Sequence, residues 1–405
     1  MSSFHDKINN STIQYLEEIN IYNSSNISGN KENPMVTVIW VNYNSRGFID
    51  IVEESLKAIL SFNYPNYETI IIDNGSTDGS FEILKNTIHE YKSNISARRV
   101  LIVRLDKNYG FAGAVNIGYK LRSSLSKYVV LINNDAIPIK NLLNVYVDFM
   151  ERHKNIGAAQ GIILRMNSNN IDSAGFMLSE LFNFIRTENI LHLSGYINND
   201  NIDVFIKICC IEGTMPIFRI EALKKALYPL INTIFIPAVR FYYLEDIFVS
   251  LKLWNSKYII ALIPKIVGGH MRKAIIKKIE TNPDFIYETR RNFIALIFMT
   301  NYKFKYTIIK NTLIFIILNI ALSIIYKKVN SYTHKILLRS LLDGIILGFY
   351  LKRTLKAIDI RKVPYVRSMK LLKYIVRLTG PLSTMAPLNE LIKEIQRNIN
   401  IKNNI

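Results

Sequence analysis

The stretch KYVVLINNDAIP, Lys127 to Pro138, joins an apolar run to three polar residues and a turn. An apolar run of this length, rich in Val and Ile, is typical of a buried strand. Asn and Asp end strands in ordinary turns, so the triplet Asn133–Asp135 has a purely structural interpretation. It also has a functional one, because open α/β sheets bind ligands beyond the carboxyl ends of their parallel strands. The stretch therefore predicts a strand and leaves the purpose of its polar end open.

Three earlier strands are predicted, and each also ends in polar residues. They span residues 34–44, 68–72 and 98–106, and their polar ends are Asn42 to Asn44, Asp73 to Asp78 and Asp106 to Gly113. Helical patterns at 47–62 and 80–91 lie between them. Strand and helix alternating at this spacing predict right-handed crossovers and a parallel sheet. Four polar strand ends then gather at one edge of the sheet, which favours a binding site over four independent turns.

Composition divides the chain into three parts. Residues 1–33 form a polar tail with a short helix expected around residues 12–19, residues 34–300 form the α/β domain, and residues 301–405 form a helical, basic and apolar region. Further along the α/β domain we expect a strand at 157–165, a helix from near Ile220, a helix at 245–254 and a last strand pair ending at His270.

The charge of the chain indicates anionic partners. It has 51 basic and 32 acidic residues, a net charge of +19, and a mean hydropathy of +0.13. A chain that is both basic and apolar is better suited to binding a membrane surface than to binding nucleic acid. The sequence also has no zinc-ligand pairs and no RNA-recognition signature. The two cysteines are neighbours, Cys209 and Cys210, so no disulfide framework is expected. Because the first 33 residues lack a secretion-signal pattern, we expect a cytoplasmic protein.

Two apolar segments follow the α/β domain, and their environment is open at this stage. Ile308 to Lys328 has a continuous apolar centre, but it is shorter than the ~20 residues of a full membrane span. Ile336 to Arg353 is more amphipathic, and basic pairs flank both segments. One alternative is a helical hairpin buried on the core. The other, which we favour, is an in-plane or re-entrant membrane hairpin with its basic residues on anionic headgroups.

Several motifs in a fixed order carry a family resemblance. They are VTVIWVNYN, IIIDNGSTDGS, NYGFAGAVNIG, VVLINNDA, YYLEDIFVSLKLW and GGH, spread over residues 34–292. Together they resemble the inverting family-two glycosyltransferases, and most closely their rhamnosyltransferase-like branch. The resemblance implies a GT-A fold, with a mixed, mainly parallel sheet flanked by helices. It also implies transfer of a sugar from a nucleotide-diphosphate donor to a hydroxyl of a glycan or lipid-linked acceptor, for cell-surface glycan synthesis at the inner face of the membrane.

The resemblance assigns the nucleotide-sugar donor to the strand ends. Asp73 would accept hydrogen bonds from the base or ribose, with Asn42 and Tyr43 beside the base. An Asx-turn from Asp73 to the Ser76 backbone is the structural alternative. Asn134 is also assigned to the donor.

The glycine-containing motif adds further donor contacts. Asn108 and Gly110 would hold the nucleotide near its ribose and diphosphate, and Asn116 would reach the same pocket. Small residues and free N–H groups at a helix start suit phosphate. Close packing of helix on sheet would require the same small residues, so both interpretations stay open.

The resemblance also implies a divalent cation. The triplet occupies the position of the family's Asp-x-Asp motif, but Asn133 replaces the first carboxylate. Asp135 is then the first ligand, and His270, after Gly268 and Gly269, is a second ligand or a diphosphate contact. Mg²⁺ or Mn²⁺ needs only one or two carboxylates when substrate phosphates supply the rest. A lone histidine is often structural, which is the alternative here.

Catalysis is assigned to the pair Glu245 and Asp246. Inversion requires a general base that removes the proton of the acceptor hydroxyl. Asp246 matches the family's base, and Glu245 is the reserve candidate. The structural alternative is helix capping, since acidic residues favour helix N-termini.

Other functions fit the sequence less well. A non-catalytic nucleotide-sugar-binding scaffold is favoured only by the missing first carboxylate. A nucleotidyltransferase would carry a glycine-rich phosphate loop after Asn44, and a processive synthase a Gln-x-x-Arg-Trp element; the sequence has neither. Charge alone suggests a nucleic-acid binder, and we expect no nucleic-acid partner.

Overall fold

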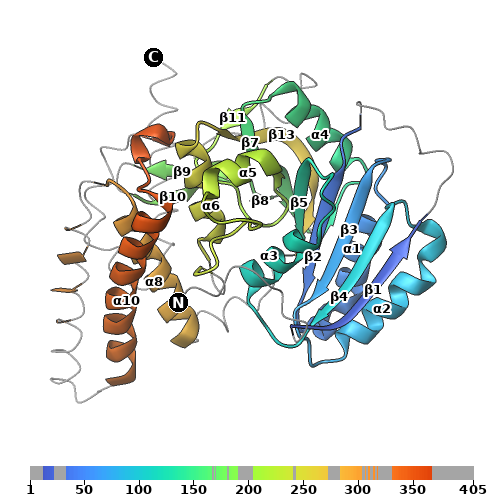
Figure 1. The fold of residues 1–405 in the computed structure, drawn as a ribbon, viewed down its shortest axis with the longest axis horizontal. Coiled ribbons are helices and arrows are strands. Elements are labelled where there is room, and N and C mark those ends of the chain that lie inside the picture. Colours follow the sequence, from blue (N-terminus) through green and yellow to red (C-terminus); the bar gives the residue numbers. More distant parts are fainter. Residues whose placement is uncertain are drawn as a thin grey trace. The chain divides into compact units, whose positions relative to one another are not determined.

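The structure is a computed structural model. It describes residues 12–21, 33–166, 168, 170–179, 182–189, 204–239, 243–271, 283–302, 306, 309–310, 313–314, 317 and 331–366. The chain forms two compact units, the first from residues 1–175 and 195–272 and the second from residues 176–194 and 273–405 (Figure 1). These two units are defined by how the chain packs. The domain boundaries predicted at residues 33 and 300 were drawn from composition, and they stay a prediction.

The first unit is built on an 11-stranded mixed sheet. The strand order is β1-β4-β3-β2-β5-β12-β7-β13-β11, while β6 pairs with β13 and β8 with β7. The strands β2, β3, β4 and β5 are parallel to their neighbours within this group, and β12 runs antiparallel between β5 and β7. The bounds are β1 Ile13–Asn20, β2 Val36–Asn42, β3 Tyr67–Asp73, β4 Arg99–Leu105, β5 Tyr128–Asn133, β6 Ala136–Pro138, β7 Ile156–Arg165, β8 Ile171–Ser173, β11 Ile206–Lys207, β12 Ile217–Arg219 and β13 Ile259–His270. The predicted α/β class and the four central strands are confirmed.

Helices cover both faces of the central strands. Their bounds are α1 Ile49–Leu60, α2 Ser80–Glu90, α3 Phe111–Leu121, α4 Leu142–Arg152, α5 Ile220–Leu227 and α6 Glu245–Asn255. Neighbouring side chains of β2 point to opposite faces. Ile39 faces Gly118 of α3, where an added Cβ would lie 3.0 Å from its methyl group. Trp40 donates its Nε1–H to Ser55 of α1 at 3.0 Å. Since both faces are covered, β2 is buried along its whole length.

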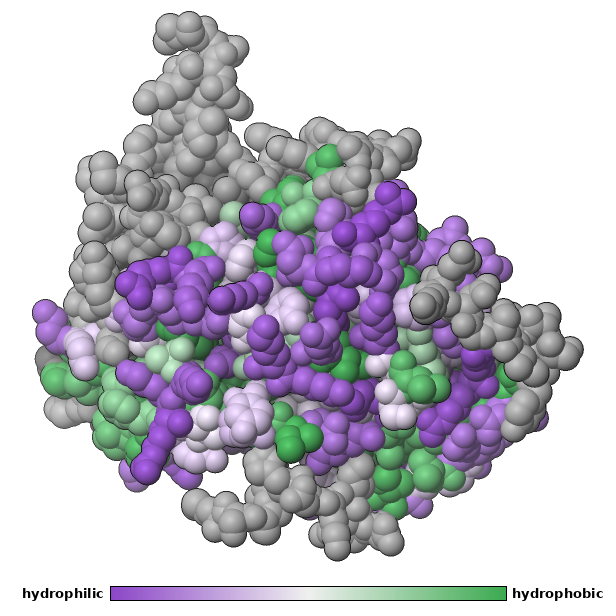
Figure 2. All heavy atoms as spheres, turned by 45° about the horizontal axis from the view of Figure 1, so that its top comes forward, coloured by the Kyte–Doolittle hydropathy of each residue, from purple (hydrophilic) through white to green (hydrophobic). Residues whose placement is uncertain are grey.

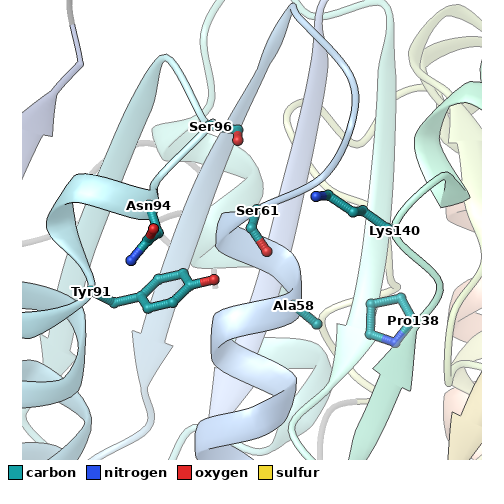
Figure 3. Close-up of a pocket in the computed structure, with 7 residues that line it drawn as sticks. All are labelled: Ala58, Ser61, Tyr91, Asn94, Ser96, Pro138 and Lys140. Carbon is teal, nitrogen blue, oxygen red and sulfur yellow. The ribbon is translucent and has the colours of Figure 1, made fainter.

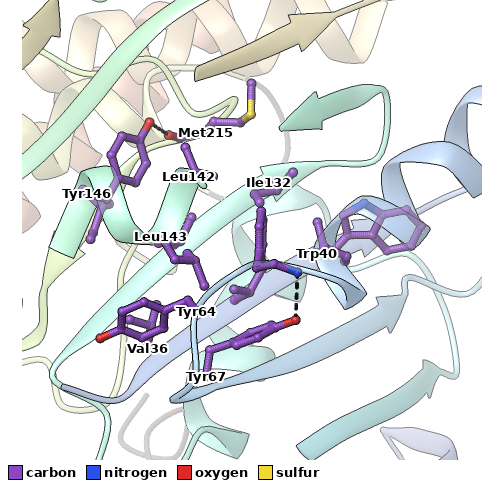
Figure 4. Close-up of a cluster of buried hydrophobic side chains, with 14 of the residues drawn as sticks. Val36, Trp40, Tyr64, Tyr67, Ile132, Leu142, Leu143, Tyr146 and Met215 are labelled. Carbon is purple, nitrogen blue, oxygen red and sulfur yellow. Dashed lines mark hydrogen bonds between the residues drawn. The ribbon is translucent and has the colours of Figure 1, made fainter. Parts of the chain in front are cut away.

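One side of the sheet holds the main hydrophobic core. Trp40, Tyr67 and Ile132 from the central strands pack there with Leu142, Leu143 and Tyr146 of α4 (Figure 4). Hydrogen bonds satisfy the polar ends of the large aromatic residues: the Tyr67 hydroxyl donates to the Leu60 carbonyl oxygen and the Tyr146 hydroxyl to that of Met215. The packed residues of β2, β3 and β5 thus fix the positions of the polar residues at the ends of these strands.

The predicted short helix around residues 12–19 is wrong. These residues form β1, the edge strand, which pairs antiparallel with β4 from Ile13 to Asn20. Exposure alternates along most of the strand, as expected when one side of an edge strand faces the core. The Tyr15 ring packs on Phe81 at 5.6 Å, and Arg99 binds Glu18. Pairing with a distant strand outweighs the weak local helix signal.

The last predicted strand pair is a single long strand, β13. It runs parallel to β7, with register shifts between Leu262 and Ile266 and between Ile266 and Gly268. Pro264 lies at the first shift, and a proline has no N–H for the ladder. The strand at 156–165 and the helices that begin at Ile220 and Glu245 are confirmed.

Among its described residues, the second unit contains a three-stranded sheet and two long helices. The sheet has the order β10-β9-β14, with β9 Phe176–Ser179, β10 Phe184–Arg186 and β14 Tyr365–Val366. The helices are α8 Pro283–Met299 and α10 Ser331–Leu355. Most of the predicted apolar segment 308–328 lies outside the described residues. In the described part of the chain, no helix is both long and apolar enough to cross a membrane. Hydrophilic side chains predominate on the face drawn in Figure 2.

Candidate active site

The polar ends of the central strands meet at one edge of the sheet. Asn42 and Asp73 are direct partners in the ladder, and Val41 is opposite Asn133. Asn42 is fully buried. Its Nδ2 donates to Asp73 Oδ1 at 2.9 Å, while its Oδ1 accepts from Ser45 Oγ at 2.6 Å and from Asn134 Nδ2 at 3.1 Å. One buried amide therefore links three segments of the edge.

Asp73 uses both of its carboxylate oxygens within the protein. Oδ2 accepts the backbone N–H of Ser76 at 3.0 Å, and Arg104 Nε lies 3.7 Å away. The side chain is almost fully buried. The Asx-turn that the sequence left open is thus present, and Asp73 shapes the loop after β3.

Asn74, which the sequence analysis did not single out, joins two loops at this edge. Its Nδ2 donates to Asn108 Oδ1 at 2.9 Å, and its Oδ1 accepts the backbone N–H of Tyr109 at 2.9 Å. Asn108 Oδ1 also accepts the N–H of Gly110 at 2.7 Å. Gly110 has φ +74°, a value that favours glycine, immediately before α3 begins. Asn108 and Gly110 are therefore placed at a helix start, as the sequence predicted.

Asn116 has a different set of partners. Its Oδ1 accepts the backbone N–H groups of Ile234 and Phe235, each at 3.0 Å, and its Nδ2 donates to the Phe235 carbonyl oxygen at 2.9 Å. The amide thereby holds the loop at residues 234–235 against α3. In contrast, Tyr43 is 43% exposed beside the buried Asn42, so its ring is available to a ligand.

Asp135 and His270 lie together, as the sequence predicted. His270 Nε2 is 3.1 Å from Asp135 Oδ1, and His270 Nδ1 is 2.7 Å from Asp172 Oδ2. The strands β6 and β13 create this contact, because His270 pairs with Ala136, the residue after Asp135. Burial alone would lower the pKa of His270, but hydrogen bonds to Asp135 and Asp172 and their charges raise that pKa to about 10. Asp172 had no signal in the sequence.

These residues fit a divalent cation that other ligands complete. A cation that displaces the proton between Asp135 Oδ1 and His270 Nε2, which lie 3.1 Å apart, would contact both atoms. Asp172 holds the imidazole by its other nitrogen, as outer carboxylates do at metal sites. The buried amide oxygen of Asn133 accepts no hydrogen bond from the residues that the structure describes. Within those residues no three His, Cys, Asp or Glu side chains form a cluster that could hold a metal. Substrate phosphate oxygens would therefore have to supply further ligands.

Glu245 and Asp246 begin helix α6. The two preceding residues, Tyr243 and Leu244, have φ values of +47° and +77°. Such backbone is strained for residues other than glycine and is concentrated at functional sites. Asp246 Oδ2 accepts the N–H of Gly213 at 3.2 Å, and its Oδ1 accepts the N–H of Ile247 at 2.8 Å. Asp246 thus contacts the first turn of α6 through one oxygen and the loop at Gly213 through the other.

The segment after Glu212 connects the two parts of the site. Asn133 donates its backbone N–H to the Thr214 carbonyl oxygen at 3.0 Å, one residue after Gly213. A Cβ at Gly213 would lie 3.8 Å from the Phe111 ring at the start of α3 and 3.9 Å from Asp246 Oδ2. The carboxylate pair, the triplet and the start of α3 are therefore joined through one short loop.

The carboxyl groups around this loop hold their protons unusually tightly. Burial raises the pKa of Asp246 well above its ordinary value, and the charges of Glu245 and Glu212 raise it further. Burial raises the pKa of Glu245 to about 7. A base with a pKa near the working pH is well suited to proton transfer. The sequence analysis did not predict Glu212 as a site residue. Its position directly before Gly213 and Thr214 was the only signal for it.

The hollow drawn in Figure 3 lies elsewhere. It is lined by Ala58, Ser61, Tyr91, Asn94, Ser96, Pro138 and Lys140. Ser61 and Ser96 precede β3 and β4, so this hollow is at the amino ends of those strands. It contains none of the predicted site residues.

Comparisons with known proteins give a consistent result. Residues 37–225 match the family described as Glycosyl transferase family 2. A putative teichuronic acid biosynthesis glycosyltransferase of Bacillus subtilis is 32% identical over 117 residues, which cover 29% of this chain and 42% of that protein. A poly-β-1,6-N-acetyl-D-glucosamine synthase of Staphylococcus epidermidis is 27% identical over 235 residues, 56% of this chain and 50% of that protein. The chain thus spans half or less of these curated relatives.

A solved structure of a mannosyltransferase from Pyrobaculum calidifontis, in complex with GDP-Man and Mn²⁺, aligns with this chain with a TM-score of 0.46 and 14% sequence identity. The overlap covers 78% of this chain and 88% of that one.

Proposed function

Since residues 37–225 match the family described as Glycosyl transferase family 2, we propose that this protein is an inverting, metal-dependent glycosyltransferase. It transfers a sugar from a nucleotide-diphosphate donor to a hydroxyl of a glycan or lipid-linked acceptor. The observation that carries the proposal is the short loop at Gly213–Thr214, which joins the Asp246 carboxylate to the Asn133–Asp135 segment. A base and a cation-binding group on one sheet edge are what such a transfer requires.

We assign the nucleotide to the ends of β2, β3 and β4. Tyr43 offers an exposed ring for the base, and the buried hydrogen-bond network of Asn42, Asp73 and Asn134 holds the strand ends beside it in place. Asn108 and Gly110 hold the start of α3, whose free N–H groups favour the diphosphate. Asn116 contributes indirectly, because it fixes the 234–235 loop next to Phe111.

Asp135 and His270 would hold Mg²⁺ or Mn²⁺. When bound, the cation neutralises charge on the leaving diphosphate. Asp172 keeps the His270 ring oriented so that Nε2 faces Asp135. Since Asn133 replaces a carboxylate, the protein supplies fewer charged ligands, and affinity depends on the phosphates of the donor.

Asp246 is the general base in this proposal. It accepts the proton of the acceptor hydroxyl as that oxygen attacks the anomeric carbon and the bond to the nucleoside diphosphate breaks. The Gly213 N–H fixes the carboxylate through one oxygen. Glu245, one residue earlier at the start of α6, orients the acceptor and raises the pKa of Asp246 through its charge.

The biological setting is a further part of the proposal. The names of the relatives point to polysaccharide made for the cell surface, and the net charge of +19 favours an anionic membrane. We therefore place the reaction at the cytoplasmic face of the cell membrane, with a peripheral membrane contact. The motifs most closely resemble the rhamnosyltransferase-like branch of the family, and the identity of the donor sugar is left to the test below.

The test is a panel of nucleotide sugars with purified protein and Mn²⁺ or Mg²⁺, measured as free nucleoside diphosphate. Slow release from one donor, lost on adding a chelator and in Asp246→Asn, would support the proposal and identify the donor. A donor that raises the melting temperature without release in any acceptor mixture, equally in wild type and Asp246→Asn, would favour a sugar-nucleotide-binding scaffold. No binding of any donor would refute the assignment of the sheet edge.

A further inference from the structure

Helix α10 has one face that is fixed against α8. At Gly344 an added Cβ would lie 2.7 Å from the Arg291 carbonyl oxygen, and at Gly348 one would lie 2.7 Å from that of Ala295. The two backbones are therefore in close contact, as small residues four apart allow. The other buried residues of α10 recur on the same side, at Leu337, Ser340, Leu341, Leu351 and Leu355. The inner face of α10 is thus fully used by the second unit itself.

The opposite face of α10 is apolar and exposed. From Leu338 the residues follow at spacings of three or four, with the neighbours Phe349 and Tyr350 at the end, which places them on one side of the helix. Phe349, at the margin of this side, also contacts Phe298 of α8, with ring centroids 5.2 Å apart. The exposed fractions are Leu338 45%, Leu342 52%, Ile346 67%, Phe349 54% and Tyr350 59%. We call these five residues the outer stripe. A contiguous apolar surface of this kind is typical of an interaction site.

Positive charge is present at both ends of the outer stripe. Lys335 and Arg339 lie near its beginning, Arg353 and Lys356 lie near its end, and all four are exposed. The single acidic residue of α10 is Asp343, which accepts a hydrogen bond from the Tyr287 hydroxyl and lies 3.4 Å from Arg339. The surface is therefore apolar in the middle and cationic at each end.

We propose that the outer stripe of α10 docks on an anionic lipid bilayer, with the helix parallel to the membrane plane. Apolar side chains would enter the acyl boundary while the cations bind headgroups, as in other in-plane amphipathic helices. The 25 residues of α10 give about 37 Å of contact along the membrane. The proposal specifies the peripheral contact named under the proposed function, and it does not depend on the transfer reaction.

The charge distribution argues against a second copy of the chain on this surface. Because both ends of the outer stripe are cationic, pairing two stripes in either direction would bring like charges together. Lipid headgroups of opposite charge remove this repulsion. The net charge of +19 favours the same partner.

The test is binding of the full chain to vesicles, measured by co-sedimentation without donor or acceptor. We expect binding to phosphatidylcholine vesicles that contain phosphatidylglycerol, weaker binding at high salt, and little binding to phosphatidylcholine alone. Ile346→Asp should weaken binding by about tenfold or more, since one apolar group is lost and a repelled charge is gained. Ile231→Asp is the matched control, because Ile231 is 73% exposed in the first unit; it should bind as the wild type does.

A second variant, Lys335→Gln with Arg353→Gln, removes two cations and retains the outer stripe. It should lose most of the preference for anionic vesicles, and circular dichroism would establish that each variant is folded. Wild-type binding that is unchanged by Ile346→Asp would overturn the proposal. So would absent vesicle binding together with self-association that Ile346→Asp abolishes, because a second copy would then be the occupant. Since no substrate is used, failure here differs from failure of the transferase assay.

Discussion

The backbone N–H of Gly213 lies 3.2 Å from Asp246 Oδ2, although 33 residues separate them. This contact fixes the carboxylate at the start of α6 and joins it to the loop that also binds Asn133. The surroundings of Asp246 explain why it holds its proton: the carboxyl group is partly shielded from water and is close to the charges of Glu245 and Glu212. The relationship between these two residues is the basis of the first three predictions.

Replacing Asp246 by Asn should abolish most of the transfer activity. The amide retains the size of the side chain but no longer accepts a proton, and general-base catalysis is worth roughly 10²–10⁴-fold in rate. Donor affinity should be retained, because the nucleotide is assigned to the ends of β2, β3 and β4, whereas Asp246 lies at the start of α6. The measurement is nucleoside diphosphate release with acceptor, together with donor binding by calorimetry. Glu245→Gln should reduce the rate less, and the reverse order would assign the base to Glu245.

Replacing Glu245 by Gln should stabilise the protein at pH 8. Burial raises the pKa of Glu245 from 4.5 to about 7 in the folded protein. The folded state therefore binds this proton more tightly than the unfolded chain, and stability falls as pH rises from about 4.5 to 7. Each unit of pKa shift corresponds to about 1.4 kcal/mol. Thermal unfolding at pH 4.5 and pH 8 should give a stabilised variant only at the higher pH, whereas equal stability at both values would contradict the shift.

Glu212 should set the pH dependence of the reaction. Its negative charge contributes to the raised pKa of Asp246, so Glu212→Gln should lower that pKa. Since the base acts only when deprotonated, the acid limb of kcat/KM should move to lower pH in this variant. The control is Glu221→Gln on α5, where the residue is exposed and outside the site. A pH profile that moves equally in both variants, or in neither, would remove Glu212 from the site.

Replacing Asn42 by alanine should lower the stability of the fold, whereas replacing Tyr43 by alanine should weaken donor binding. Asn42→Ala removes the hydrogen bonds to Asp73 Oδ1 and the Ser45 hydroxyl, at a cost of roughly 1–3 kcal/mol for each buried group left unpaired. Tyr43→Ala should leave the free energy of unfolding nearly unchanged, because the ring is exposed, and should weaken donor binding. Urea unfolding and donor titration measure the two effects. Unchanged donor affinity in Tyr43→Ala would place the base elsewhere.

Asp135→Ala should weaken the binding of Mn²⁺ in the presence of nucleoside diphosphate by about tenfold or more, since one of the few protein ligands is lost. Isothermal titration of Mn²⁺ into the protein with nucleoside diphosphate gives the affinity directly. Asp148→Ala, on the exposed side of α4, is the matched control. An equal loss of Mn²⁺ affinity in both variants would indicate a general effect of charge, and Asp135 would then not be a metal ligand.

The sequence by itself determined the elements that depend on local patterns. Apolar runs with polar ends gave β2, β3, β4 and β5, and helical periodicity gave α1, α2 and α6, because side-chain spacing within a segment decides which backbone can bury it. The order of these elements predicted a parallel sheet. The gathering of Asn42, Asp73 and Asn133 at one edge followed from that topology.

The tertiary structure alone decided what depends on distant partners. Residues 13–20 form a strand because β4 supplies the other half of the ladder, and the amide of Asn116 meets a loop more than a hundred positions away. Asp172 beside His270 and Glu212 near Asp246 have the same origin. A single sequence encodes local periodicity directly, whereas hydrogen bonds and charge interactions between remote side chains exist only after the chain has folded.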